Sequence, residues 1–169
     1  MTGLGKKLNV TGSRTILTTL DEVRAASVAV ANQAQRMLTI FTHDLEPLLY
    51  DQTAFLDAAK RLVLARSYAK VRVLVADPSR TIWEGNKFFG MARRLTGCIE
   101  LRNIHKTIAP NPSAFLIADD RALLYRLQAS RWEGIAEMSD QAVVRKYVGY
   151  FDEVWRASEP ESGLRQMHL

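Results

Sequence analysis

The chain has 169 residues, of which 47% are hydrophobic and 24% charged, and this composition is typical of one globular domain that buries its own core. The single cysteine excludes an internal disulfide and a cysteine-ligated zinc cluster, and no run of about 18 apolar residues predicts a membrane-spanning helix. The amino-terminal segment lacks the apolar stretch of a secretory signal, so a soluble, cytoplasmic protein is expected.

The net charge of +5 is unevenly distributed along the chain. Residues 60–106 carry eleven basic and three acidic side chains, whereas residues 19–59 carry two basic and six acidic ones. A basic block of this kind suits a partner with phosphate groups, such as a nucleic acid, although it also fits an ordinary solvated helix face. The residues of the predicted polyanion patch are Lys60, Lys87, Arg93 and Arg94.

The first hundred residues predict alternating helices and strands. Residues 1–18 are a predicted mobile basic tail that ends in a short strand, and Thr19 with Glu22 forms a capping box for the first helix. A helix over 19–34 is followed by a buried strand over 36–42, and a helix from Asp51 to about 66 is followed by a strand over 70–76. A third helix follows Asp77-Pro78-Ser79 and ends at Gly97, and a strand covers 98–102.

The rest of the chain predicts a hairpin and one long helix. Two apolar strands over 114–118 and 122–127 are joined by the turn Asp119-Asp120-Arg121, and a polar segment leads to an amphipathic helix capped by Ser139. Residues 158–169 are a predicted disordered tail. Strands separated by helices pair in parallel, so the prediction is an α/β fold in which the hairpin completes a mixed sheet with helices on both faces.

Polar residues at the carboxyl ends of the predicted strands are candidate ligand-binding groups. His43 and Asp44 follow one strand and His105 follows another, and two histidines beside a phosphate could act as nucleophile and general acid. Arg126 and Arg131 lie close to Trp132 in the sequence and could hold a phosphate or pair with nearby glutamates. No dinucleotide, phosphate-loop or metal-ligand motif occurs, so neither a cofactor nor a metal is predicted.

The segment 115–121, FLIADDR, resembles the strand and turn of the phospholipase D superfamily, in which the motif HxKxxxxD is written into a similar apolar run. The predicted order of elements also resembles one half of a phospholipase D fold. Phe151 and Trp155 resemble the F-x-x-x-W pair of the helix that ends such domains. The resemblance covers residues 19–157, which we therefore take as the predicted domain.

The family motif is incomplete in this chain. Counting back from Asp119 places Pro112 at the histidine position and Ala114 at the lysine position. In the family the histidine forms a covalent phosphohistidine and the lysine steadies the phosphate oxygens. The glycine and serine that usually follow the second strand are replaced by Arg126 and Leu127. The resemblance therefore implies a degenerate, non-catalytic member.

Two functions remain open at this point. The first is a binding or regulatory module for a phosphate-bearing ligand or a protein partner, and the alternative is a phosphodiesterase or nuclease with a relocated site that uses His43, His105 and Asp119. A nucleic-acid-binding accessory protein is a weaker third option, because no aromatic ladder is interleaved with the basic residues. The family pairs two similar halves, so one half predicts a homodimer whose face includes strand 114–118, Trp132 and Ile135. The ligand-binding residues of the first function are His43, Asp44, His105, Asp119, Arg126 and Arg131.

Overall fold

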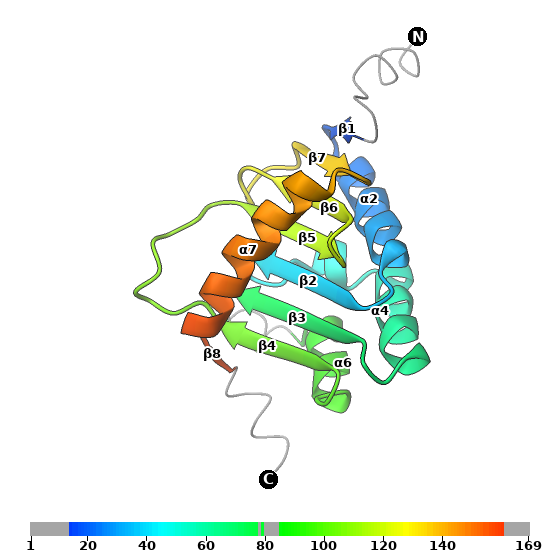
Figure 1. The fold of residues 1–169 in the computed structure, drawn as a ribbon, viewed down its shortest axis with the longest axis vertical. Helices are drawn as coiled ribbons and strands as arrows, with labels where there is room; N and C mark the ends of the chain where they lie inside the picture. Colours follow the sequence, from blue (N-terminus) through cyan, green and yellow to red (C-terminus); the bar gives the residue numbers. More distant parts are fainter. Residues whose placement is uncertain (1–13, 78, 80–84, 161–169) are drawn as a thin grey trace.

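The computed structural model describes residues 14–77, 79 and 85–160, which form one eight-stranded sheet with helices on both faces (Figure 1). The strand order across the sheet is β1-β7-β6-β5-β2-β3-β4-β8. The strands are β1 (Arg14–Leu17), β2 (Met37–Thr42), β3 (Lys70–Val75), β4 (Ile99–Asn103), β5 (Ala114–Ala118), β6 (Ala122–Arg126), β7 (Gly134–Glu137) and β8 (Glu159–Pro160).

The sheet is mixed, as the sequence predicts. Strands β2, β3 and β4 pair in parallel, and their connections contain helices. Strand β5 runs antiparallel to β2 and continues through the hairpin into β6, which pairs with β7. Because β5 is antiparallel to β2, the start of β5 lies beside the end of β2. The candidate site lies at these strand ends.

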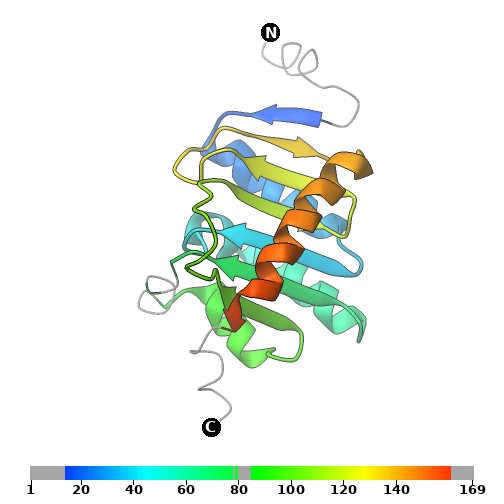
Figure 2. The same ribbon diagram turned by 60° about the vertical axis from the view of Figure 1, so that its left-hand side comes forward.

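Helices cover the two faces unequally. Among the described helices, only α7 (Gln141–Ala157) crosses one face of the sheet, running diagonally from the β6–β7 side to β4 (Figure 2). Four helices of the described part of the chain pack on the opposite face. They are α2 (Leu20–Gln33), α3 (Pro47–Tyr50), α4 (Thr53–Ala65) and α6 (Lys87–Arg94).

Each face has its own core. Alternate residues of the strands, such as Leu38 and Ile40 of β2, pack with the four helices. On the α7 face the core is aromatic, because Phe41 and Phe115 stack with ring centroids 4.8 Å apart and α7 adds Tyr147 and Tyr150. The sheet is therefore packed between two apolar layers. The polar residues of the candidate site lie at the ends of the strands, outside these layers.

Several boundaries differ from the predicted ones. Strand β7 and the short helix α3 were not predicted, and α4 begins after Gln52 because the Asp51 carboxylate accepts hydrogen bonds from two amides of α6 instead. Asp140, not Ser139, caps α7, and Leu95 is the C-cap of α6 in place of Gly97. The start of the predicted third helix and the outer parts of both predicted tails lie outside the described residues.

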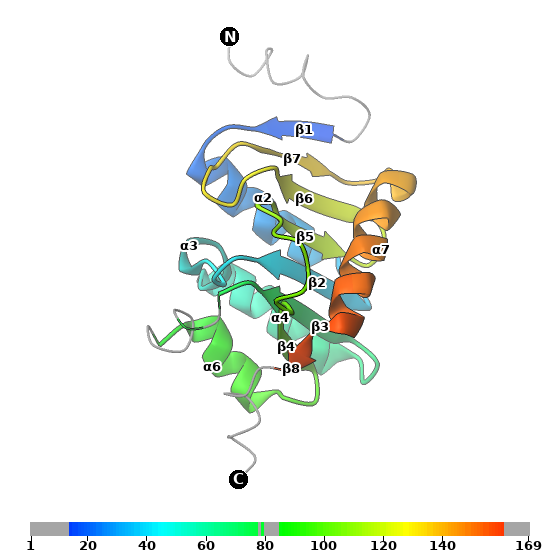
Figure 3. The ribbon, with the colours of Figure 1, turned by 90° about the vertical axis from the view of Figure 1, so that its left-hand side faces the viewer.

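The sheet includes residues on both sides of 19–157, among them the short strand predicted at the end of the first 18 residues. Strand β1 pairs with β7 along one edge of the sheet and β8 pairs with β4 along the other (Figure 3). Within the described part of the chain, no helix has the length and hydropathy needed to span a bilayer.

Candidate functional site

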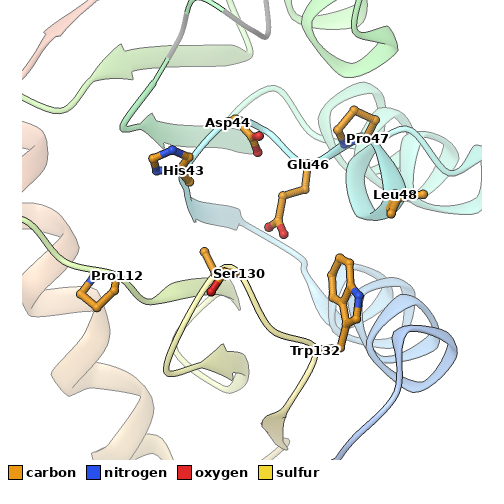
Figure 4. A pocket seen from close by; sticks show the side chains of 9 residues that line it. His43, Asp44, Glu46, Pro47, Leu48, Pro112, Ser130 and Trp132 are labelled. Atoms are coloured by element: carbon orange, nitrogen blue, oxygen red, sulfur yellow. The ribbon is translucent and has the colours of Figure 1, made fainter.

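A cavity of about 590 Å³ opens at the carboxyl end of β2 (Figure 4). The segment after β2, the start of α3, the segment before β5 and the loop after β6 all contribute to its wall. Trp132 closes one side, and the Glu46 side chain points into the space between Ser130 and Trp132. The lining residues are His43, Asp44, Glu46, Pro47, Leu48, Pro112, Ala129, Ser130 and Trp132.

The antiparallel pairing of β2 with β5 brings these segments together. Phe41 of β2 faces Phe115 of β5, so the chain just before β5 reaches the same edge as the chain just after β2. The Ala129 amide donates a 2.6 Å hydrogen bond to the Pro112 carbonyl, which ties the loop after β6 to this segment. Pro112, which the sequence places at the motif histidine, is therefore part of the cavity wall.

The Arg126 side chain fills the space beneath the cavity. It lies at the end of β6, is only 2% exposed, and forms an ion pair with the Glu46 carboxylate. Its guanidinium also donates 2.9 Å hydrogen bonds to the carbonyls of Ala129 and Arg131, and it lies 4.9 Å from the centroid of the Trp132 ring. These contacts use Arg126 to hold the loop 127–132, so this arginine supports the cavity from below rather than lining it.

Burial sets the electrostatics around Glu46. Removal from water raises the pKa of the Glu46 carboxyl above its usual value, and the charge and hydrogen bond of Arg126 oppose that shift. Tyr50 of α3 is fully buried nearby, and the same loss of water raises the pKa of its hydroxyl. The base of the cavity therefore contains one buried ion pair, Glu46 with Arg126.

Asp119 lies at the other end of the strands from the cavity, where β5 ends and β2 begins. Its carboxylate accepts hydrogen bonds of 2.8 to 3.3 Å from the amides of Gln35, Arg36 and Met37, just where β2 begins. Asp119 itself adopts a left-handed backbone with φ of 57°, which aspartate tolerates better than most residues. The structure therefore does not bring this predicted ligand-binding residue to the cavity, and its carboxylate instead ties the hairpin turn to β2.

The other predicted site residues are only partly brought together. His43 and Asp44 line the cavity, whereas His105 follows β4 and is separated from the end of β2 by β3. The His105 ring lies 2.7 Å from the Thr107 hydroxyl of its own turn. Arg131 is an exposed residue whose guanidinium lies 3.6 Å from Glu133, so its side chain does not enter the cavity.

Three residues of the predicted polyanion patch line a second, smaller cavity of about 390 Å³ between α4 and α6. Lys60 of α4 and Lys87 and Arg94 of α6 line it, together with one acidic residue, Asp57. Arg93 is not part of this lining and lies 5.8 Å from the centroid of the Phe89 ring. The structure thus gathers three of the four predicted residues into one groove.

Sequence reasoning did not single out Glu46. Its partner Arg126 is 80 residues away, and neither residue belongs to a recognised motif. The available signal was the arginine itself, because it ends an otherwise apolar strand and a buried arginine needs an acidic partner. Among the described residues, no three His, Cys, Asp or Glu side chains are placed to hold a metal ion.

The arrangement of strands and helices defines a phospholipase D-like fold. The chain aligns with Nuc, a phospholipase D family member from Salmonella typhimurium, with a TM-score of 0.61 and 10% identity over 88% of this chain and 97% of that one. NucT from Helicobacter pylori aligns with a TM-score of 0.57 and 13% identity over 88% of this chain and 98% of that one. At these identities the likeness concerns the fold alone.

A third neighbour is TrmBL2, an archaeal chromatin protein described as having a novel mode of DNA binding. It aligns with a TM-score of 0.64 and 18% identity over 92% of this chain, which spans 55% of the TrmBL2 chain. No curated protein matches the sequence significantly. Residues 19–167 match the family described as "Domain of unknown function (DUF7931)", and the chain belongs to that family.

Proposed function

We propose that this chain is a non-catalytic phospholipase D-like module that binds a ligand or a protein partner in the cavity at the end of β2. The observation that carries the proposal is the replacement of the reacting groups at this position. Pro112 lines the cavity where the family resemblance expects the nucleophilic histidine, and Ala114 follows where it expects the lysine. Proline has no nucleophilic side chain and alanine has no charge, so neither the attack on phosphorus nor the clamping of its oxygens has a group to perform it.

The environment of Arg126 supports the same proposal. This arginine replaces the glycine expected after the second strand of the hairpin, and it is buried in contacts with Glu46 and two carbonyl groups. A guanidinium held in this way cannot turn toward a substrate without leaving a carboxylate and two carbonyls without their donor. The residue therefore stabilises a shaped cavity and is not available as a replacement for the missing lysine.

The alternative enzyme would use His43 and His105. These residues follow β2 and β4, and because β3 lies between them their strands are separated by roughly 10 Å, twice the spacing of neighbouring strands. The Thr107 hydroxyl engages the His105 ring, and the His105 amide donates to the Ser158 hydroxyl. These contacts hold His105 in its own turn and favour the non-catalytic function.

Purified protein is expected to show no hydrolysis of bis(p-nitrophenyl) phosphate or of DNA above the buffer rate. The physical reason is the absence of a nucleophile and of a cationic clamp at Pro112 and Ala114. Release of nitrophenolate and nicking of a plasmid are the measurements, with His43→Ala and His105→Ala as matched samples. Metal-independent turnover that disappears in either histidine variant would establish the alternative enzyme.

A second candidate function is the binding of a nucleic acid through the groove between α4 and α6. Lys60, Lys87 and Arg94 come from two helices and face one space, and no described carboxylate forms a salt bridge with any of them. Such a cluster attracts phosphate groups without reading a base sequence. The DNA-binding neighbour TrmBL2 is compatible with this function.

Retention on a DNA or heparin column is expected to fall as salt rises, and the triple variant K60Q/K87Q/R94Q is expected to elute at clearly lower salt. Each lost phosphate contact removes about one counterion from the salt dependence. The matched control is K106Q/R121Q/K146Q, which removes the same charge from other exposed positions. Equal elution of both triple variants would mean that net charge alone, and not the groove, determines binding.

The module is also proposed to be a homodimer, because it is one half of an arrangement that the family builds from two. The predicted face needs revision, since β5 lies in the middle of the sheet and all five of its residues are buried. Light scattering should give twice the chain mass of 19.1 kDa. A mass of one chain across the micromolar range would contradict the dimer.

A further inference from the structure

The lining of the cavity at the end of β2 lacks the lysine or arginine side chains that usually hold a phosphate. This lining contains two carboxylate residues, Asp44 and Glu46, one histidine, His43, and neither lysine nor arginine. The cation that lies below it, Arg126, is already neutralised by Glu46. A phosphate group placed here would lie near two carboxylates, and Arg126 cannot turn to meet it without leaving Glu46 and two carbonyls without their donor.

Glu46 offers a specific acceptor to a ligand. Only its Oε2 atom is bonded to Arg126, and no described residue donates to its Oε1 atom. The side chain is 11% exposed and points into the cavity (Figure 4). An ionised carboxylate oxygen accepts more than one hydrogen bond and pairs best with a charged N–H donor. The free oxygen is therefore placed to receive an ammonium or guanidinium group.

The remaining walls are apolar. Leu48 is 50% exposed at the cavity, and the indole ring of Trp132 packs against the main core on its way to the cavity wall. The volume of about 590 Å³ lies within the range of cavities that enclose drug-sized ligands. The other apolar lining residues are Pro47, Pro112 and Ala129.

We infer that this cavity binds an amine or guanidine attached to an apolar body, with the cation at Glu46 and the body against Trp132. The inference rests on the proposed function, because it names the ligand class of the same cavity. Two sources share this chemistry. One is a free small amine, and the other is a lysine or arginine side chain presented by a partner protein.

The test compares three probes of similar shape and different charge. Phenethylamine, 2-phenylethanol and phenyl phosphate are titrated into ¹⁵N-labelled protein, and the Trp132 indole N–H signal is followed by NMR after assignment with Trp132→Phe. The amine is expected to shift this signal with a Kd of about 1 mM or tighter, whereas phenyl phosphate leaves it unmoved. A glycine-flanked arginine peptide forms a fourth arm, and tighter binding of that peptide than of phenethylamine identifies a protein side chain as the source.

Two variants locate the binding. Glu46→Gln keeps an acceptor for Arg126 while removing the charge, and it is expected to weaken amine binding at least tenfold. Ala129→Leu leaves the ion pair intact and fills the cavity, so it is expected to abolish binding even if Glu46→Gln fails to fold. Amine binding that survives Ala129→Leu, or phenyl phosphate binding tighter than phenethylamine, would overturn the inference. Turnover in the phosphodiesterase assay would overturn the proposed function instead, since amine binding does not depend on that result.

Discussion

Replacing Arg126 with methionine is expected to lower the free energy of unfolding by about 3–5 kcal/mol, because it leaves the buried Glu46 carboxylate without its partner. The same change removes the donors for two loop carbonyls and the cation beside Trp132. Urea denaturation followed by far-UV circular dichroism measures the loss. A change below about 1 kcal/mol would mean that the pair contributes no more than an exposed one.

The control for this prediction is five residues away. Arg131→Met removes a guanidinium that is 66% exposed and 3.6 Å from an equally exposed Glu133, so a change within about 0.5 kcal/mol is expected. The double variant Arg126→Met/Glu46→Leu replaces both charges with apolar groups and is expected to recover most of the loss, since no buried charge then remains unpaired. If the double variant were as unstable as the single one, the loss would come from packing rather than from the unpaired carboxylate.

Replacing Asp119 with alanine is expected to cost about 2–4 kcal/mol. The change removes a charged acceptor for three amides at the start of β2 and places alanine in a left-handed conformation. Asp119→Asn keeps one oxygen acceptor and a side chain that tolerates this conformation, so about half of that loss is expected. Thermal and urea unfolding of the two variants are the measurements.

The adjacent residue provides a matched control. Asp120 pairs with Arg145 at 3.0 Å, but both side chains are largely exposed, at 40% and 64%. Asp120→Ala is therefore expected to cost less than about 1 kcal/mol. Equal losses for Asp119→Ala and Asp120→Ala would contradict the structural role assigned to Asp119. Neither change is expected to alter the cavity, which lies at the opposite ends of β2 and β5.

Much of the fold could be predicted from the sequence because its strands are strongly patterned. The apolar runs that form β2, β3 and β5 have no competing helical period, and the capping box of Thr19 with Glu22 forms as predicted. Strand β7 was missed because its four residues, GIAE, are short and mixed in polarity. Its conformation depends on β1 and β6 on its two sides, and on Gly134, where a Cβ would lie 2.4 Å from the Tyr125 carbonyl oxygen.

The candidate site was less accessible to sequence reasoning. His43 and Asp44 were found because they follow an obvious strand, and both line the cavity. Glu46 and Arg126 meet across 80 residues, and no local pattern records such a contact. Asp119 was predicted to bind a ligand, but β5 runs antiparallel to β2, so Asp119 lies at the start of β2 and away from the cavity. Distant pairing of strands, rather than residue type, therefore limited the prediction of the site.

The pairing of β1 with β7 has a consequence for the order in which the chain can fold during its synthesis. Arg14 and Glu137 face each other across this pair although 123 residues separate them. At about 5–20 residues per second, a ribosome needs on the order of 6–25 s to make the intervening chain. Strands β2 and β3 can associate early in that interval, while the side of β2 that later receives β5 stays unpaired. The time for which β1 must wait before it can pair with β7 is therefore set by the speed of translation.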